Sequence, residues 1–519
     1  MKALASLFLL SCVACIWEPL KDTAHSEPQR VYYQVFLRSF CDSNGDGIGD
    51  VVGLSGKLDY LSDLGINGLW LMPVHPSGSY HKYDVRDFYG IDPEYGTMEE
   101  FKTLLREAHK RDIKVVIDLV LNHTDDEHPW FQDALGGPES QFRPFYLWAS
   151  PDSITEAKHL WHDQPADGTK VNSSKESFYG FFWKGMPDLN YDHPPLRDSI
   201  LQIGRYWLKE VGVDGFRLDA ALLIYPYYEG PQAAYLQKTL AWWDVFHKAM
   251  EETRPNTFLV GEVWQSDTVL LPFLASGLDA CFHFDLSNRI IETVLAEKDS
   301  FDLAGQLLAY RQQLAAFPEP NPERTDAIFL SNHDQDRLRS RFDGSWEKAG
   351  LAASILLTLP GTPFIYYGEE LGMLGKKPDK HIREPFPWAL PGTDPCQTAW
   401  QSLEYNMPEK TPPLSEQQFK EGSLWKHYRK LIHFRNTHPV MGQGEISPFE
   451  GKLPAGMLGY YRVLGEKRLL VLHQLAGRRS VLTWKGAGAV LFSTHAGSGI
   501  TGDVLRMAPF STLVLEQKS

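Results

Sequence analysis

Carboxylates and histidines follow four short apolar runs in this chain of 519 residues, in each case where the run ends. The segments are DLVLNH, GFRLDA, GEVW and LSNHD, and they contain His123, Arg217, Asp219, Glu262, His333 and Asp334. A single aspartate after a strand is often only the cap of the next helix. Four such positions in order favour one shared site, because parallel β/α folds gather the residues that follow their strands at one face.

Two of these carboxylates have the surroundings that hydrolysis of a glycosidic bond requires, one ionised group and one protonated group. Arg217 lies two residues before Asp219, on the same face of a strand, where its positive charge favours the ionised carboxylate. Asp219 is therefore the predicted nucleophile. Glu262 precedes Val263 and Trp264, whose apolar character predicts a raised pKa and the role of general acid and base.

Three further residues complete this hypothesis. We expect Asp334 to stabilise the positive charge that develops on a sugar ring, and His123 and His333 to donate hydrogen bonds to sugar hydroxyls. The sequence leaves open whether the anomeric configuration is retained or inverted, because that depends on the distance between the two carboxyl groups.

These segments belong to an alternation of short β-rich runs and amphipathic stretches, which indicates parallel β/α units. Eight runs are present, beginning at Val31, Gly68, Lys114, Gly215, Thr257, Ala280, Ala327 and Phe364. Eight units predict an α/β fold built on a closed (β/α)8 TIM barrel. Thr97 and Glu100 form a capping-box pattern before one predicted helix, and residues 196–211 carry the apolar stripe of another.

Departures from the alternation divide the chain into predicted domains. The interval between the third and fourth runs is the longest, which predicts a subdomain inserted over residues 124–190 into a barrel of residues 30–123 and 191–438. Short alternating runs with glycine turns predict a C-terminal all-β sandwich domain over residues 439–519. Aromatic side chains of the insertion would either stack on sugar rings or form its own core: Trp130, Trp148, Phe182 and Trp183.

Residues 1–15 have the features of a secretory signal peptide, because one lysine precedes an apolar run that is too short to span a bilayer. LLSC and CVAC resemble a lipoprotein cleavage box, in which Cys12 or Cys15 would carry the lipid. A buried N-terminal helix is the alternative. We therefore expect an exported protein, either secreted or lipid-anchored at the bacterial cell envelope, with any membrane attachment through that lipid only.

Composition excludes one class of partner and one class of scaffold. The net charge of -15 and the lack of a basic cluster argue against nucleic-acid binding. Beyond the signal segment, Cys41, Cys281 and Cys396 lie far apart in the sequence. We expect buried or idle thiols there, neither a disulfide framework nor a metal site.

The four segments, together with YHKYD and MPDLN, resemble the conserved regions of the α-amylase family of glycoside hydrolases (family 13), from about Val31 to the C-terminus. The resemblance implies a retaining double displacement. In it, Asp219 is the nucleophile, Glu262 is the acid and base, and Asp334 stabilises the transition state. The inserted segment would be the domain called B in that family.

The same resemblance extends to residues that would bind the sugar. It implies that Tyr83 stacks on the sugar ring with His81 beside it, and that Asp84 supports the cluster around Arg217. Two arginines resemble substrate-binding arginines of relatives, although either could make a structural ion pair: Arg337 and Arg383.

The motifs also resemble one group within the family. MPDLN, at residues 186–190, lies between the motifs of oligo-1,6-glucosidases and neopullulanases, and Ala220 resembles enzymes that cut α-1,4 bonds. This implies an intermediary bacterial α-amylase acting on starch, maltodextrins and related α-glucans. The alternatives are α-glucosidase, oligo-1,6-glucosidase or neopullulanase-like activity on short oligosaccharides. A binding subunit without activity is disfavoured because all three carboxylates are present. The chain departs from the family at Leu222 and Leu223, where Lys-His is usual, and at Lys82, where glycine is usual.

The loop DSNGDGIGD, residues 42–50, places side-chain oxygens at alternate positions, as calcium loops do. An EF-hand is excluded, since position 12 is Gly53 rather than glutamate and a strand, not a helix, precedes the loop. We expect one structural Ca2+ with five ligands: Asp42, Asn44, Asp46, the Ile48 carbonyl and Asp50. The alternative is a glycine-rich turn without metal.

Overall fold

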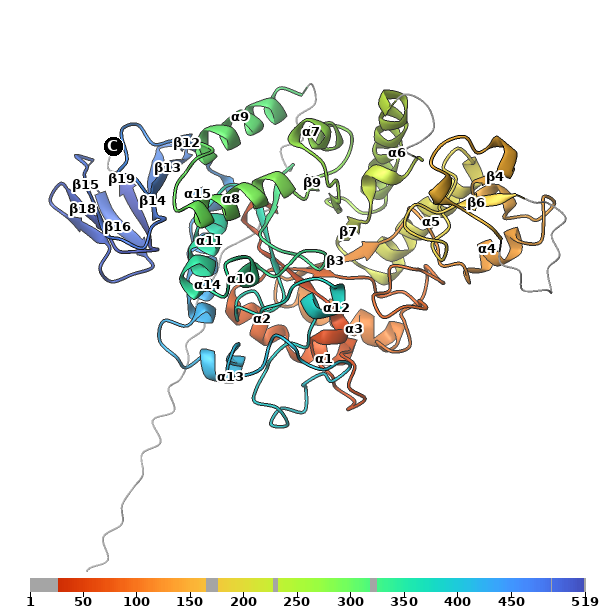
Figure 1. Ribbon diagram of the computed structural model, residues 1–519, viewed down its shortest axis with the longest axis horizontal. Helices are drawn as coiled ribbons and strands as arrows, with labels where there is room; N and C mark the ends of the chain where they lie inside the picture. Colours follow the sequence, from red (N-terminus) through yellow and green to blue (C-terminus); the bar gives the residue numbers. More distant parts are fainter. Residues whose placement is uncertain (1–26, 165–175, 227–231, 318–323, 487, 518–519) are drawn as a thin grey trace, which may run out of the picture.

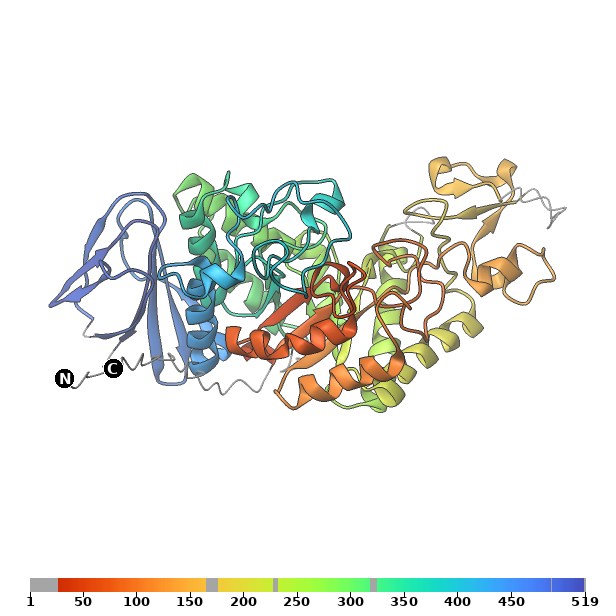
Figure 2. The ribbon, with the colours of Figure 1, turned by 90° about the horizontal axis from the view of Figure 1, so that it is seen from below.

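The computed structural model describes residues 27–164, 176–226, 232–317, 324–486 and 488–517. The predicted signal peptide lies outside these ranges. Figure 1 shows a central barrel with the inserted segment at one end and the C-terminal sheets at the other, and Figure 2 shows the same order from below. None of the helices within the described ranges has the length and apolar character that a membrane span needs.

Eight parallel strands form the barrel. In chain order they are β1 (Tyr32–Val35), β2 (Gly68–Leu71), β3 (Lys114–Leu119), β7 (Gly215–Leu218), β8 (Phe258–Gly261), β9 (Ala280–Cys281), β10 (Ala327–Phe329) and β11 (Thr362–Tyr366). Hydrogen bonds join them in the order β10-β11-β1-β2-β3-β7-β8-β9, and a parallel bridge between Phe282 and Ala327 closes the ring. The predicted (β/α)8 barrel is therefore confirmed.

The barrel strands are buried on both faces, which explains their continuous apolar runs. Aromatic rings fill the interior. Tyr32 stacks on Phe364 with centroids 4.8 Å apart, and Trp70 packs on Phe282 at 5.0 Å. The barrel interior is therefore packed with aromatic side chains. The polar residues lie above them, at the carboxyl ends of the strands.

Helices surround the barrel. They are α1 (Val51–Gly56), α2 (Leu58–Leu64), α3 (Met98–His109), α5 (Pro194–Tyr206), α6 (Gln232–Thr253), α7 (Asp267–Ala275), α8 (Phe284–Ala296), α9 (Leu303–Ala315), α10 (Leu338–Arg341), α11 (Trp346–Thr358), α12 (Asp379–Ile382), α13 (Leu414–Gln417) and α14 (Leu424–Thr437). The predicted capping box of α3 is confirmed, because Thr97 and Glu100 exchange both of its hydrogen bonds. The predicted stripe of the second helix is buried along α5 and the π-turn at Trp207–Val211.

One buried ion-pair cluster ties helices to strands beside β9. His283 lies 2.7 Å from Asp326 through Nδ1 and 2.8 Å from Asp267 through Nε2. Although burial alone would lower it, the two carboxylates raise the pKa of His283 to about 9. The imidazolium therefore joins α7, α8 and the residue before β10.

The inserted segment between β3 and β7 has a small sheet of its own, in the order β4 (Trp148–Ala149), β6 (Ser177–Tyr179) and β5 (Trp161–His162), beside α4 (Pro129–Ala134). Trp148 stacks on Phe131 and Trp130 stacks on Phe142, each with centroids 5.9 Å apart. These two tryptophans are partly buried and pack against the core of the insertion. Two further aromatic residues are about half-exposed at 47% and 50%, Phe182 and Trp183.

The C-terminal residues form two antiparallel sheets after α15 (Pro439–Gln443). The larger comprises β12 (Glu445–Pro448), β13 (Met457–Leu464), β14 (Lys467–Gln474), β19 (Thr512–Gln517) and β16 (Gly488–Ser493), and the smaller comprises β15 (Ser480–Thr483), β18 (Val504–Met507) and β17 (Gly499–Thr501). Buried residues of both sheets share one core, including Leu472 and Leu513 of the larger and Leu505 of the smaller. This is the predicted all-β sandwich.

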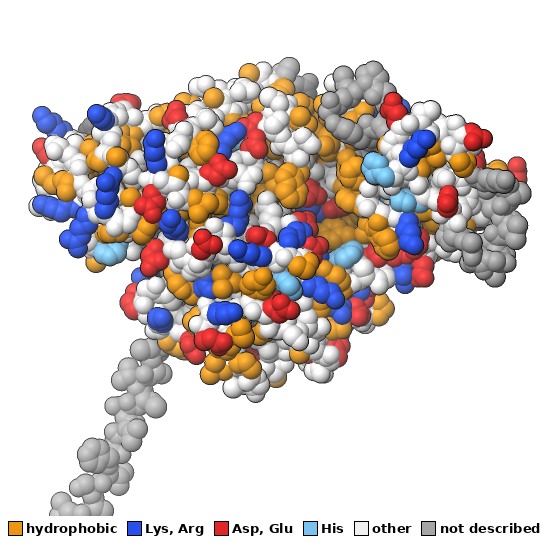
Figure 3. Space-filling model, in the orientation of Figure 1, with side chains coloured by type: hydrophobic (Ala, Val, Ile, Leu, Met, Phe, Trp, Pro, Cys, Tyr) orange, Lys and Arg blue, Asp and Glu red, His pale blue; other side chains and the backbone are white. Residues whose placement is uncertain are grey.

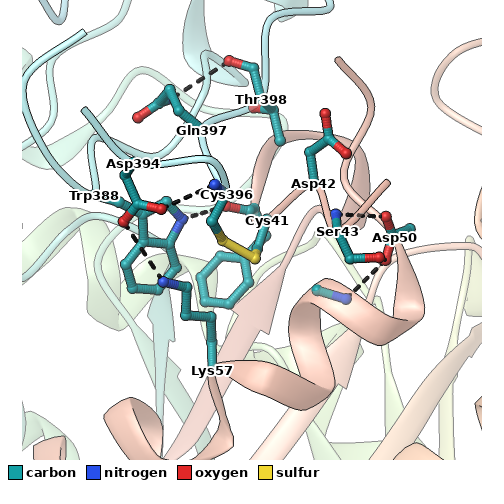
Figure 4. Close-up of a disulfide and its surroundings, with 12 residues drawn as sticks. Cys41, Asp42, Ser43, Asp50, Lys57, Trp388, Asp394, Cys396, Gln397 and Thr398 are labelled. Carbon is teal, nitrogen blue, oxygen red and sulfur yellow. Dashed lines mark hydrogen bonds and ion pairs between the residues drawn. A yellow bond between two sulfur atoms is a disulfide. The ribbon is translucent and has the colours of Figure 1, made fainter. Parts of the chain in front are cut away.

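The prediction that the cysteines are unpaired thiols was wrong for two of the three. Cys41 and Cys396 form a disulfide, with Cα atoms 4.9 Å apart and a sequence separation of 355 (Figure 4). The pairing follows from tertiary contact between the β1–α1 loop and the long segment after β11, where the Asp42 amide also donates to the Cys396 carbonyl. Cys281 is buried and free, as predicted.

Candidate active site

The site is centred on Arg217, which is buried at the end of β7. Its Nη1 atom lies 2.6 Å from Asp219 and 2.8 Å from Asp118, and its Nη2 atom lies 2.8 Å from Glu262. Strand register produces this arrangement, since Asp118 of β3 and Arg217 are paired neighbours and Glu262 directly follows β8. One guanidinium therefore holds carboxylates from three adjacent strands.

The surroundings of Glu262 are suited to a proton donor. Burial raises the pKa of Glu262 to about 7, and the charges of Asp219 and Asp334 act in the same direction against the lowering by Arg217. The predicted apolar flank contributes through Val263, which is fully buried, whereas Trp264 is half-exposed and stacks on Phe284. The Ala220 amide donates to the carboxyl at 3.2 Å and fixes its position.

Sequence reasoning missed Asp118. The carboxyl accepts hydrogen bonds from Trp70 and Tyr83 and contacts Arg217, and burial raises its pKa to about 7. The signal was available, because Asp118 interrupts the otherwise apolar segment VVIDLV, and a charged residue inside a buried strand needs partners.

A hydrogen-bonded chain connects the predicted histidine and tyrosine. Gln34 donates to Nδ1 of His333 at 2.7 Å, so the proton is placed on Nε2, which lies 2.6 Å from the Tyr83 hydroxyl. That hydroxyl donates in turn to Asp118. The rings of Tyr83 and His333 are parallel within 7°, with centroids 5.3 Å apart. Their proposed contacts with a sugar stay predictions.

His81 and His123 both contact Tyr83. The His81 ring is 6.0 Å from the Tyr83 ring, and Nε2 of His123 donates to the Tyr83 carbonyl at 3.1 Å. Burial lowers the pKa of both histidines, which favours neutral rings. Phe182 packs edge-on against His123 at 5.2 Å, so one exposed aromatic residue of the insertion borders the site.

Asp334 faces the cluster from the end of β10, paired with Arg383. Its carboxylate lies 3.0 Å from the Arg383 guanidinium and 3.0 Å from Nε2 of His333. Burial alone would raise the pKa of Asp334, but these neighbours lower it well below the ordinary value. Arg383 therefore makes an ion pair, which was one of the two roles that the sequence left open for it.

Two predicted substrate contacts need correction. Arg337 is buried, donates to the backbone carbonyls of Ile382 and Tyr367, and packs over two tyrosine rings, so it braces a loop and does not line the site. Asp84 accepts from the hydroxyls of Ser77 and Ser79. The carboxylates that contact Arg217 are instead those of Asp118, Asp219 and Glu262. Asp118 occupies the position that Asp84 was expected to take.

Lys82, at a position where the family resemblance implies glycine, has the left-handed backbone conformation that glycine favours, with φ 65°. Its ammonium lies 2.8 Å from Asp92 and 2.7 Å from Glu94. The ion pairs offset the backbone strain, so the departure from the family pattern leaves the turn beside Tyr83 in place. The space-filling view is hollowed between the barrel and the insertion, with acidic and hydrophobic side chains around the hollow (Figure 3).

The predicted calcium loop folds on itself between β1 and α1. Asp42 accepts backbone N–H groups of Asn44, Gly45 and Gly47. Asp50 accepts from Ser43 (Figure 4), and it caps α1 by accepting from the Gly53 amide. Among the described residues, no three His, Cys, Asp or Glu side chains are grouped as a metal site. The oxygen-only donor set suits Ca2+ chemically, with amide and carbonyl oxygens supplying part of it.

Comparison with known proteins gives consistent matches over most of the chain. A family model described as alpha amylase, catalytic domain, matches residues 34–444. Alpha-amylase 3 of Dictyoglomus thermophilum is 41% identical over 445 residues, which are 86% of this chain and 84% of that protein. A 4-alpha-glucanotransferase of Thermotoga neapolitana is 35% identical over 476 residues, 89% of this chain and 99% of that protein. The crystal structure of an alpha-amylase from H. orenii has 39% identity and a TM-score of 0.84, covering 94% of this chain and 99% of that one.

Proposed function

The chain belongs to the α-amylase family of glycoside hydrolases, and from that premise we propose a retaining hydrolase that cleaves α-1,4-glucosidic bonds in starch, maltodextrins and related α-glucans. The observation that carries the proposal is the cluster in which Asp219 and Glu262 contact the two terminal nitrogens of Arg217. Carboxyl groups held by one guanidinium favour the short spacing of retaining enzymes.

The mechanism assigns opposite protonation states to the two groups. Ionised Asp219 attacks the anomeric carbon while Glu262 gives its proton to the departing glycosidic oxygen, which leaves a glycosyl ester on Asp219 and a free chain end. Glu262 then takes a proton from water, whose oxygen attacks the anomeric carbon and releases Asp219. The raised pKa of Glu262 supports this role, since the acid must be protonated near neutral pH.

Asp334 supplies negative charge opposite this pair. Its lowered pKa keeps it ionised, and a positive charge on the sugar ring is stabilised by a carboxylate that is already in place. Arg383 and His333 hold the Asp334 side chain from two sides, so we propose that they orient it. The Tyr83 ring, which stacks on His333, would face the sugar.

Product analysis on soluble starch tests the proposal. Early release of maltose and longer oligomers is expected, whereas glucose alone would indicate an α-glucosidase and rapid cleavage of isomaltose an oligo-1,6-glucosidase. Chain transfer between maltodextrins without reducing-sugar gain would indicate a glucanotransferase. Asp219→Asn and Glu262→Gln should remain folded and each lose activity by several orders of magnitude. Turnover near that of the wild type in either variant would refute the assignment.

We also propose that the loop at residues 42–50 binds one structural Ca2+. Its support is the donor chemistry, with the side-chain oxygens of Asp42, Asn44 and Asp46 at alternate positions. Chelation should lower the unfolding temperature and added Ca2+ should restore it. An unchanged unfolding temperature, with no ion detected by elemental analysis, would leave the glycine-rich turn as the correct reading.

Export, as a secreted or lipid-anchored protein, is likewise a proposal. The Cys41–Cys396 disulfide supports it, because such bonds persist in oxidising compartments. Mass spectrometry of the N-terminus of the protein from its own cells should find a lipid on Cys12 or Cys15, or a cleaved secreted form. An intact Met1 in the cytoplasmic fraction would overturn the proposal.

A further inference from the structure

A second cavity lies at the junction of the barrel and the C-terminal sheets, away from the Arg217 cluster. Its volume is about 410 Å³, within the range of roughly 300–1,000 Å³ typical of small-molecule sites. The walls come from the start of α11, from α13 and the start of α14, and from loops that flank β17 and β18. Figure 1 shows α11 and α14 beside the β14 and β16 sheet.

Trp346 gives this cavity a fixed aromatic surface. The guanidinium of Arg339 lies 3.8 Å from the centre of the ring, and the lack of a side chain at Gly372 lets the edge of the ring approach the backbone there. The side chain nevertheless keeps 36% of its surface exposed. The ring is thus held in place while part of it remains free for a ligand.

Phe510 adds a second ring in an unusual conformation. It lies in the cavity wall between β18 and β19 with φ 48°, a left-handed conformation that costs a bulky residue about 1–2 kcal/mol. Strain of this kind is retained where the surrounding structure enforces it, commonly at ligand sites. Two aromatic side chains from different domains therefore border one cavity.

Gln417 supplies a buried polar group that lacks a partner. Its amide nitrogen donates to the carbonyls of Leu371 and Pro412 at 2.8 and 2.9 Å, which fixes the orientation of the side chain. The Oε1 atom then has no hydrogen-bond donor among the described residues, although only 2% of the residue is exposed. Because Gln417 is one of the residues that line the cavity, a ligand hydroxyl is the proposed donor to this oxygen.

The charges around the cavity select against an ion. Glu347 and Lys420 contribute opposite signs, and the side chains of His495 and Thr494 add hydrogen-bonding groups. A flat apolar surface combined with hydrogen-bonding groups of both kinds fits the apolar face and hydroxyl rim of a sugar ring. We propose that this cavity is a second carbohydrate site, which binds glucosyl units of an α-glucan while another part of the same chain occupies the active site. This inference rests on the proposed function, from which the ligand class is taken.

Binding stoichiometry tests the site without reference to turnover. Calorimetric titration of the intact Asp219→Asn protein with maltoheptaose should show two sites, and adding Trp346→Ala or Gln417→Leu should remove one. Tyr89→Ala is the matched control, because Tyr89 is 41% exposed and lies outside the cavity. One site in the Asp219→Asn protein, or two sites that persist in both cavity variants, would overturn the inference.

Kinetics separate this inference from the proposed function. In the otherwise unchanged protein, Trp346→Ala should raise KM for soluble starch about 3- to 10-fold, the loss expected of one ring contact, and leave kcat/KM for a short chromogenic maltoside unchanged. If the wild type cleaves neither substrate, the proposed function fails while the titration still decides the cavity. If it cleaves both and the variant matches it on starch, the cavity takes no part and the inference is wrong.

Discussion

The pH dependence of hydrolysis should report the protonation of Glu262. Burial raises the pKa of Glu262 from 4.5 to about 7, and the charges of Asp219 and Asp334 add to the effect. The contact with Arg217 at 2.8 Å opposes it and is outweighed. Because the protonated form donates to the leaving oxygen, about half of the protein is competent at pH 7, and each further pH unit should remove about tenfold of the rate.

The assay compares two leaving groups from about pH 5 to about pH 9 in the wild type and in Glu262→Gln. On a maltooligosaccharide, the wild type should lose rate above pH 7, and the variant should be slower by about 10²–10⁴-fold with no loss above that pH. On a maltosyl fluoride, whose leaving group needs no proton, the variant should recover the first step and release fluoride in a rapid burst. The second step, in which Glu262 takes a proton from water, should stay slow. A decline above pH 7 that persists unchanged in Glu262→Gln would refute the reasoning.

Three further predictions concern stability. Replacing Cys41 and Cys396 by serine should lower the unfolding temperature, since the chain-entropy estimate for a sequence separation of 355 is about 6 kcal/mol; equal temperatures without reductant would contradict this. Because the pKa of His283 is raised in the folded protein, the stabilisation that protonated His283 provides is complete below about pH 6.5 and is lost as pH rises through about 9. The free energy of urea unfolding of His283→Gln should therefore depend less on pH in this range than that of the wild type. Lys82→Gly should relieve about 1 kcal/mol of backbone strain. It should nevertheless destabilise the protein overall by about 2 kcal/mol or more in denaturant unfolding, because it leaves buried Asp92 without its cation. A more stable variant would show that strain dominates.

The barrel could be predicted because its signals are local. Each of the eight strands begins within two residues of the run that predicted it, and the Thr97 capping box lies where the side-chain pattern placed it. Strand ends also located the catalytic candidates, since the closed sheet brings all carboxyl ends to one face whatever the loops between them do.

Contacts between residues that are far apart in the sequence could not be predicted from local patterns. The partner of Cys41 depends on how the segment after β11 packs against the β1–α1 loop, and no local pattern encodes that contact. Arg337 lies three residues from Asp334, but packing against Tyr366 and Tyr367 turns its side chain away from the site. Asp118 interrupts an apolar strand, which signals that it needs partners, but the sequence does not identify those partners as Trp70, Tyr83 and Arg217.

The balance of charges around Arg217 affects both the pKa of Glu262 and the stabilisation of a positively charged sugar ring. One guanidinium contacts Asp118, Asp219 and Glu262, so a single positive charge faces three carboxyl groups, and Asp334 adds a fourth nearby. The excess negative charge attracts a positive sugar ring, and the same excess keeps the proton on Glu262. The two properties therefore change together. Removing the charge of Asp334 by substitution with asparagine weakens cation stabilisation and also lowers the pKa of Glu262, which moves the decline in rate to lower pH.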